Sequence, residues 1–144
     1  MARDEGNDFM TEGGDYKSLV VWQKSITMVK SIYKLTSVFP SDERFGLISQ
    51  MRRAAVSVPS NIAEGQARRT TGDYIRFVSN AEGSLAELET QLLISIELDY
   101  LVRPDVASCF ELMSEIRKML NGLRRSLLTR ANGSSEPSSL VPRH

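Results

Sequence analysis

Residues 74–96 read YIRFVSNAEGSLAELETQLLISI, and their apolar positions recur every three or four residues. This spacing places the apolar side chains on one face of an α-helix and most polar ones on the other. Thr70 or Thr71 is suited to cap the start of this helix, with Asp73 in its first turn, and the pattern ends near Tyr100. The apolar face consists of Tyr74, Phe77, Ala81, Leu85, Leu88, Leu92 and Ile96.

Three further segments carry the same helical period, at about residues 19–38, 41–68 and 104–129. Ser41 is suited to cap the second helix, whose apolar period starts at Phe45, and Pro104 suits the first position of the fourth. We predict that the second helix is kinked at Pro59, because proline removes a helical hydrogen bond. Short connections favour antiparallel neighbours. The predicted fold is therefore all-α, an antiparallel up-down-up-down four-helix bundle.

The helical region is predicted to be one domain, residues 17–130, between two polar tails. Residues 1–16 hold five acids and one base and are expected to form a flexible acidic leader. Residues 131–144 are expected to form a flexible tail, in which residues 140–143 (LVPR) match a thrombin cleavage sequence, as a vector-derived segment would. With no signal-peptide pattern, one cysteine and no run of about 18 apolar residues, we expect a cytoplasmic protein that does not enter a membrane.

The composition argues against most catalytic chemistries. Cys109 lies in an apolar helical pattern, where a buried, unreactive thiol is expected, and the only histidine, His144, is the last residue. Two such residues far apart do not suit a metal or haem site, and a catalytic triad would need an internal histidine. We therefore expect no cofactor, no metal and no enzymatic activity. The alternative is an acid–base site at Glu87 and Glu89, which predicts a concave pocket around them.

The charges are segregated along the chain although they sum to zero. Residues 82–99 carry five acids and no base, whereas residues 117–130 carry five bases and no acid. In an antiparallel bundle the end of the second helix, the start of the third and the end of the fourth would meet. Arginine suits phosphate, and the start of a helix attracts anions. The arginines expected at this end are Arg68, Arg69, Arg76, Arg124, Arg125 and Arg130.

Two alternatives remain for these arginines. The cluster at the end of the bundle could bind nucleic acid, or it could be a solvated cluster that favours the dipole at helix C-termini. A second pair, Arg52 and Arg53, could contact nucleic acid as well, or it could pair with Glu87 or Glu89 across the helices.

The most unusual segment is residues 50–65, QMRRAAVSVPSNIAEG. Pro59 deprives the Ala55 carbonyl of its amide partner, and Ser57, Ser60 or Asn61 could satisfy the freed backbone groups. The functional alternative is a polar pocket or contact patch at the kink. In the next helix Gly83 costs about 1 kcal/mol of helix propensity, which indicates a close helix approach.

Six segments together carry a family resemblance: residues 19–24 (LVVWQK), 32–36 (IYKLT), 39–40 (FP), 43–47 (ERFGL), 50–65 and 83–92. Over about residues 17–128 the chain resembles the bacterial four-helix bundle protein family, also called the ribosomal intervening-sequence protein family. The resemblance implies a left-handed antiparallel bundle that assembles as a ring-like homopentamer and has no established enzymatic activity. Some members are encoded within intervening sequences of large-subunit ribosomal RNA genes. The family is also similar to the accessory variability determinant proteins of diversity-generating retroelements, which bind nucleic acid and a reverse transcriptase.

We therefore predict a non-enzymatic oligomeric scaffold that binds nucleic acid, with structured RNA favoured, through arginine–phosphate contacts. The alternative is a protein-interaction scaffold whose arginines serve its own subunit interfaces. The expected partners are further copies of the chain, RNA or DNA, and, in the alternative, another protein. The first candidates for nucleic-acid binding are Arg68, Arg69, Arg124 and Arg125, followed by Arg52 and Arg53.

Overall fold

The computed structural model describes residues 15–134, and this part of the chain contains helices and turns but no strand. The elements are η1 (Tyr16–Ser18), α2 (Val20–Thr36), η2 (Ser41–Glu43), α3 (Leu47–Gln66), α4 (Thr71–Glu97) and α5 (Arg103–Ser134). Here η marks a short 3-10 helix. The all-α four-helix fold is thus confirmed, while the kink at Pro59 stays a prediction.

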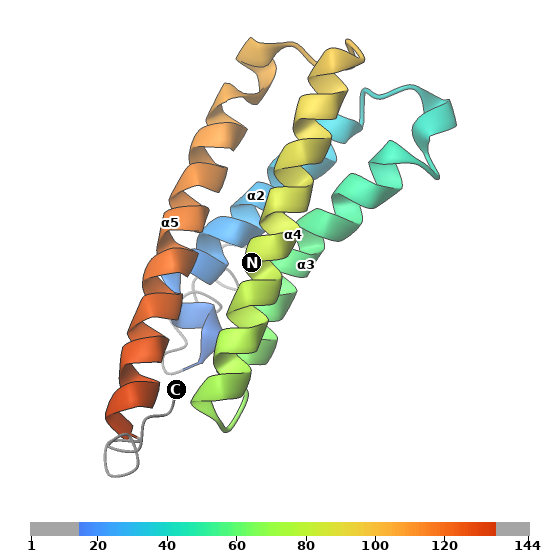
Figure 1. The fold of residues 1–144 in the computed structure, drawn as a ribbon. Helices are drawn as coiled ribbons and strands as arrows, with labels where there is room; N and C mark the ends of the chain where they lie inside the picture. The colour runs from blue at the N-terminus through green and yellow to red at the C-terminus, as the bar shows by residue number, and fades with distance from the viewer. Residues whose placement is uncertain (1–14, 135–144) are drawn as a thin grey trace, which may run out of the picture.

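The four long helices pack in a cycle, so that α2 and α4 each contact both α3 and α5 (Figure 1). α2 and α4 therefore occupy opposite corners of the bundle. Gly65 near the end of α3 lies against Phe77 near the start of α4, and Met51 near the start of α3 contacts Ser95 near the end of α4. These contacts run in opposite directions along the two helices.

The start of α3 differs from the prediction. Ser41 lies in η2 and does not cap α3, which begins only at Leu47. The backbone of Gly46 (φ −111°, ψ −110°) interrupts the helical path, and the Glu43 carboxylate accepts a hydrogen bond from the Leu47 amide at 3.0 Å. Phe45, expected on the apolar face, is 89% exposed. Periodicity extended the helix too far because it does not detect a cap made by a side chain in the preceding turn.

Both ends of α4 have identifiable caps. The predicted cap Thr70 is confirmed, since its hydroxyl accepts a hydrogen bond from the Asp73 amide at 3.1 Å. The helix ends at Glu97, before the predicted Tyr100, because Asp99 adopts a left-handed backbone with φ 62°. The Tyr100 amide then donates to the Ser95 carbonyl at 2.9 Å, which satisfies one of the carbonyls left free at a helix end.

The helical domain extends beyond its predicted bounds at both ends. Tyr16, assigned above to the acidic leader, belongs to η1, and its ring centroid lies 5.3 Å from that of Trp22. α5 continues to Ser134, so the first residues of the predicted tail are helical. The rest of the two predicted tails, residues 1–14 and 135–144, lies outside the described residues, and His144 with it.

The core consists of side chains from all four long helices. Cys109 is buried, as predicted, and burial raises the pKa of its thiol to about 11. Within residues 15–134, no helix has the length and apolar content to cross a membrane, and no three His, Cys, Asp or Glu side chains gather to hold a metal ion. The fully buried side chains include Met28, Ile32, Met51, Val58, Ile62, Leu85, Leu88, Leu92, Met113, Ile116, Leu120 and Leu127.

Candidate nucleic-acid interface

Four arginines gather where α3 ends and α4 begins, beside the last turns of α5, at the lower end of the bundle in Figure 1. Arg130 of α5 lies near Tyr74: burial raises the pKa of that phenol, and the positive charge of Arg130 partly offsets this. We call the cluster the basic end; it consists of Arg68, Arg69, Arg76 and Arg130.

Two arginines of the basic end share one aromatic ring. The guanidinium carbons of Arg68 and Arg76 each lie 4.7 Å from the ring centroid of Phe77. The ring is itself fixed, since Phe77 is buried and packs closely on Gly65. Cation–π contacts of this kind orient a guanidinium without neutralising its charge. The two arginines are therefore held in place before any ligand arrives.

Acidic neighbours reduce the charge of the basic end only in part. Arg68 lies 3.6 Å from Glu64, and Arg76 lies 3.6 Å from Asp73. All four side chains are largely exposed, and such surface pairs contribute less than about 1 kcal/mol. Arg69 is exposed and has no ion-pair partner among the described residues. The site can thus offer guanidinium groups to an anion at little energetic cost.

The other two first-choice arginines lie farther along α5. Arg124 is level with Glu82, well inside α4, and its Nε donates to the Glu82 carboxylate at 3.0 Å. A second bond of 2.6 Å joins Arg124 to Asn121. This position corrects the expectation that Arg124 shares one end with Arg68. The adjacent Arg125 is exposed and, within residues 15–134, has no ion-pair partner.

Arg52 and Arg53 do not pair with the carboxylates of α4, contrary to one of the two expectations for them. Arg52 donates to the Thr36 hydroxyl at 2.9 Å and to the Tyr33 carbonyl at 3.3 Å, and it lies over the Tyr33 ring at 4.4 Å. It therefore stabilises the end of α2. Arg53 is exposed, with one long bond of 3.4 Å to Ser49.

The carboxylates considered for an acid–base site have other roles in the protomer. Glu89 forms an ion pair of 2.7 Å with Arg117 of α5. Glu87 accepts a hydrogen bond from Gln91 at 3.4 Å. Leu88, on the same turn as both, is fully buried and fills the core beneath them. Gln91 itself is buried, and its Oε1 has no hydrogen-bond partner in the described part of the chain.

The Pro59 segment forms a polar seam with α4. The hydroxyls of Ser57 and Ser84 lie 2.8 Å apart, and the side-chain amide of Asn61 donates to the Ser57 carbonyl at 2.8 Å. The Asn61 donor thus serves the Ser57 carbonyl, not that of Ala55. The close approach predicted at Gly83 is wrong within residues 15–134, because a Cβ there would meet no atom of this part of the chain within 4 Å.

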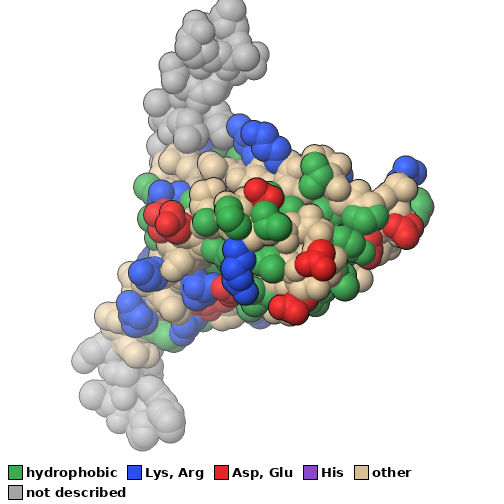
Figure 2. All heavy atoms as spheres, turned by 90° about the horizontal axis from the view of Figure 1, so that it is seen from above, with side chains coloured by type: hydrophobic (Ala, Val, Ile, Leu, Met, Phe, Trp, Pro, Cys, Tyr) green, Lys and Arg blue, Asp and Glu red, His purple; other side chains and the backbone are tan. Residues whose placement is uncertain are grey.

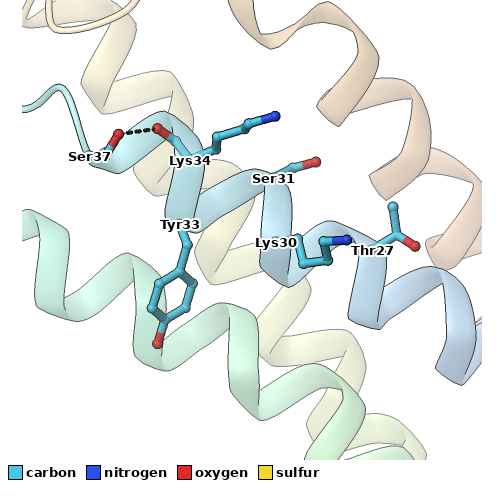
Figure 3. A pocket seen from close by; sticks show the side chains of 6 residues that line it. All are labelled: Thr27, Lys30, Ser31, Tyr33, Lys34 and Ser37. Atoms are coloured by element: carbon cyan, nitrogen blue, oxygen red, sulfur yellow. Dashed lines mark hydrogen bonds between the residues drawn. The ribbon is translucent and has the colours of Figure 1, made fainter. Parts of the chain in front are cut away.

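The sequence analysis did not predict the basic surface on α2. α2 carries Lys24, Lys30 and Lys34 and no acid, a signal that a charge count over residues 20–36 would have found. Lys30 and Lys34 border a hollow of about 590 Å³ together with Thr27, Ser31, Tyr33 and Ser37. In Figure 3, Tyr33 turns towards α3, whereas Lys34 and Ser31 extend from the other side of α2.

The opposite end of the bundle has a different character. Figure 2 views this end, where the α2–α3 and α4–α5 connections lie, and shows hydrophobic side chains together with carboxylates and with Lys or Arg side chains. Val38, Phe45 and Val102 are 70%, 89% and 57% exposed. One end of the bundle therefore carries the arginine cluster, whereas the opposite end exposes apolar side chains among acidic residues and the arginines Arg44 and Arg103.

The family model described as 23S rRNA-intervening sequence protein matches residues 17–122. No curated protein matches the chain.

Proposed function

Because the chain belongs to the 23S rRNA-intervening sequence protein family, we propose that it is a non-enzymatic oligomeric scaffold that binds nucleic acid, with structured RNA favoured. The observation that carries the proposal is the basic end. Two of its guanidinium groups are positioned on Phe77, and Arg69 beside them has no acidic partner among the described residues. Arginine forks suit phosphate oxygens, and a side chain already in place loses less entropy on binding.

The arginines have different roles in this proposal. Arg69 and Arg125 are exposed and contact phosphate directly. Arg68 keeps the same role, since its pair with Glu64 is long and exposed. Arg124 and Arg52 hold neighbouring side chains in place and do not themselves contact phosphate, because Arg124 is already hydrogen-bonded to Glu82 and Arg52 to Thr36. The protomers assemble as a homopentamer, as the sequence resemblance implies, and repetition of the basic end strengthens binding to a long phosphate backbone.

The first experiment is a salt series of fluorescence anisotropy with short labelled RNA and DNA, each single- and double-stranded. Phosphate contacts release counterions, so the logarithm of affinity falls linearly with that of salt concentration, with a slope of about −0.9 per contact on duplex DNA. We expect binding that weakens steeply with salt and is tightest for structured RNA. Absence of binding at low salt would overturn the proposal.

A pair of variants tests the assigned residues. Arg69→Glu together with Arg125→Glu should weaken binding at least tenfold and reduce the salt slope by about two contacts. The matched control is Arg103→Glu with Lys118→Glu, which changes the net charge equally at exposed positions elsewhere. Equal loss in both pairs would assign binding to overall charge and not to these two positions.

In the alternative, a protein-interaction scaffold, one arginine is still available to serve a subunit interface. Arg53 is exposed beside the Ser57–Ser84 seam, and its one long hydrogen bond leaves most of its donors unused. In this alternative it donates to a neighbouring subunit. Arg53→Ala should then lower the assembled mass in light scattering while helical circular dichroism is unchanged, and Arg103→Ala should not. An unchanged mass for Arg53→Ala would remove the alternative.

A further inference from the structure

Gly83 has no structural reason within the protomer. It lies in the interior of α4, where glycine is less favourable than alanine, and an added Cβ would meet no atom of the described residues within 4 Å. Gly65 is different, since Phe77 and Tyr74 occupy the space beside it. A helix-interior glycine that leaves a bare backbone on the surface would allow a helix from outside the protomer to approach closely.

The surface around Gly83 is suited to helix packing. Leu93 and Ile94 are 44% and 43% exposed, and the helical period places them on the outer side of α4 with Gly83. Glu87 and Glu97 flank this side and have no ion-pair partner among the described residues. We call this surface the α4 outer face; it comprises Gly83, Ala86, Glu87, Leu93, Ile94 and Glu97.

The opposite corner of the bundle carries the complementary charge. α2 has three lysines and no acid, and of these only Lys24 is paired, with Glu115 at 3.0 Å. Lys30 and Lys34 are exposed, with no ion-pair partner in the described part of the chain, and they border the hollow shown in Figure 3. We call this surface the α2 outer face; it comprises Thr27, Lys30, Ser31 and Lys34.

The two faces match in height as well as in charge. Adjacent α3 residues Met51 and Arg52 contact Ser95 of α4 and Thr36 of α2, so these two residues lie at one level of the bundle. α2 and α4 both run opposite to α3 and therefore run in the same direction as each other. Lys34 comes two residues before Thr36 in α2, and Ile94 comes one residue before Ser95 in α4, so Lys34 and Ile94 lie at nearly the same height. Copies placed side by side in the same orientation would therefore bring the lysines of one beside the carboxylates of the next.

We propose that the α4 outer face of one copy packs against the α2 outer face of the next. Leu93 and Ile94 enter the hollow beside Lys30 and Lys34, and α2 of the neighbour crosses the bare backbone at Gly83. Two different surfaces on opposite corners make a heterologous contact, which closes into a ring when the rotation permits. This interface rests on the proposed function in requiring self-association, and it leaves the basic end free.

Charge reversal tests the interface with the intact chain. Lys30→Glu/Lys34→Glu and Glu87→Lys/Glu97→Lys should each weaken self-association by about 100-fold or more, because like charges then face each other. Combining all four substitutions in one chain restores opposite charges at every contact, so the fourfold variant should recover an assembled mass in light scattering. If neither double variant changes the mass, or if the fourfold variant stays dissociated, the interface is wrong.

A glycine pair tests the close approach separately from charge. Gly83→Gln should lower the assembled mass because its side chain occupies the space of the neighbouring helix. Gly122→Gln on α5 is the control, since a Cβ at Gly122 also meets no atom within 4 Å. Circular dichroism should show retained helix in both, and equal assembly of the two variants would overturn the close approach.

The outcomes separate this interface from the proposed function. A wild-type protein that is monomeric at all concentrations would refute both the interface and the oligomeric scaffold. An assembled wild type that tolerates the charge reversals would refute the interface alone. Nucleic-acid affinity of the Arg69→Glu/Arg125→Glu variant, measured by anisotropy, tests the basic end in either case.

Discussion

Replacing Gly65 with alanine should destabilise the protein even though alanine favours a helix. A Cβ at position 65 would lie 2.8 Å from the Cβ of Phe77 and 3.0 Å from Cδ1 of Tyr74. The Phe77 Cβ is bonded directly to the α4 backbone, so rotation of a side chain cannot relieve the overlap. The helices α3 and α4 must separate locally, which loosens the packing around a fully buried core.

The magnitude follows from a matched pair. Gly122→Ala gains about 1 kcal/mol of helix propensity with no steric cost, since no atom lies within 4 Å of its added Cβ. Gly65→Ala has the same gain but incurs an overpacking cost of about 1–3 kcal/mol. The propensity gain cancels in the comparison, so Gly65→Ala should be about 1–3 kcal/mol less stable than Gly122→Ala.

Urea unfolding followed by circular dichroism measures the difference. The midpoint should fall for Gly65→Ala and rise slightly for Gly122→Ala, with similar slopes in both. A Gly65→Ala variant as stable as Gly122→Ala would refute the reasoning, because it would show that α3 and α4 are not closely packed at this point. Gly65→Ala should also weaken RNA binding modestly, since Phe77 positions two arginines of the basic end.

Three further predictions concern single groups. Asp99→Gly should raise thermal stability by up to about 1 kcal/mol, because the φ of 62° suits glycine better than aspartate. Hydrogen bonds, first from the Leu47 amide and then from the Tyr100 hydroxyl, lower the pKa of Glu43 in the folded state. The stability that ionised Glu43 gives the folded protein is therefore complete above the ordinary carboxyl pKa and is lost as pH falls through the lowered, folded-state pKa. Glu43→Gln should show a weaker dependence of its urea midpoint on acid pH. Burial raises the pKa of Cys109 to about 11, so a thiol reagent at pH 8 should react slowly with native protein and rapidly in urea, and fast native reaction would contradict the burial.

Much of the fold was predictable because helical periodicity depends on local sequence. The apolar spacing over residues 74–96 and the Thr70 cap both appear in the structure at the expected places. The start of α3 was not predictable in the same way. There the carboxylate of Glu43 replaces the expected Ser41 cap, and Phe45 is left in solvent although it fits the apolar period.

The candidate site was likewise predictable in part: the positions of some arginines could be predicted from the sequence, but the partners of others could not. Arg68, Arg69 and Arg76 could be placed at one end from the order of the helices, and the structure brings them together. The partners of Arg124 and Arg52 could not be predicted. A net charge over a segment does not say which acid lies opposite which base, and that depends on the level at which two helices pack.

The amino-acid sequence by itself determined the four helices, their order, the burial of Cys109 and the separation of acidic from basic segments. These features follow from side-chain periodicity and local charge. Only the tertiary structure decided that Gly65 is packed against α4 while Gly83 is bare, and that Arg124 is paired while Arg125 is free within the described chain. The physical reason is that close packing and ion pairing act between residues far apart in the chain, and their geometry is set only when the helices come together.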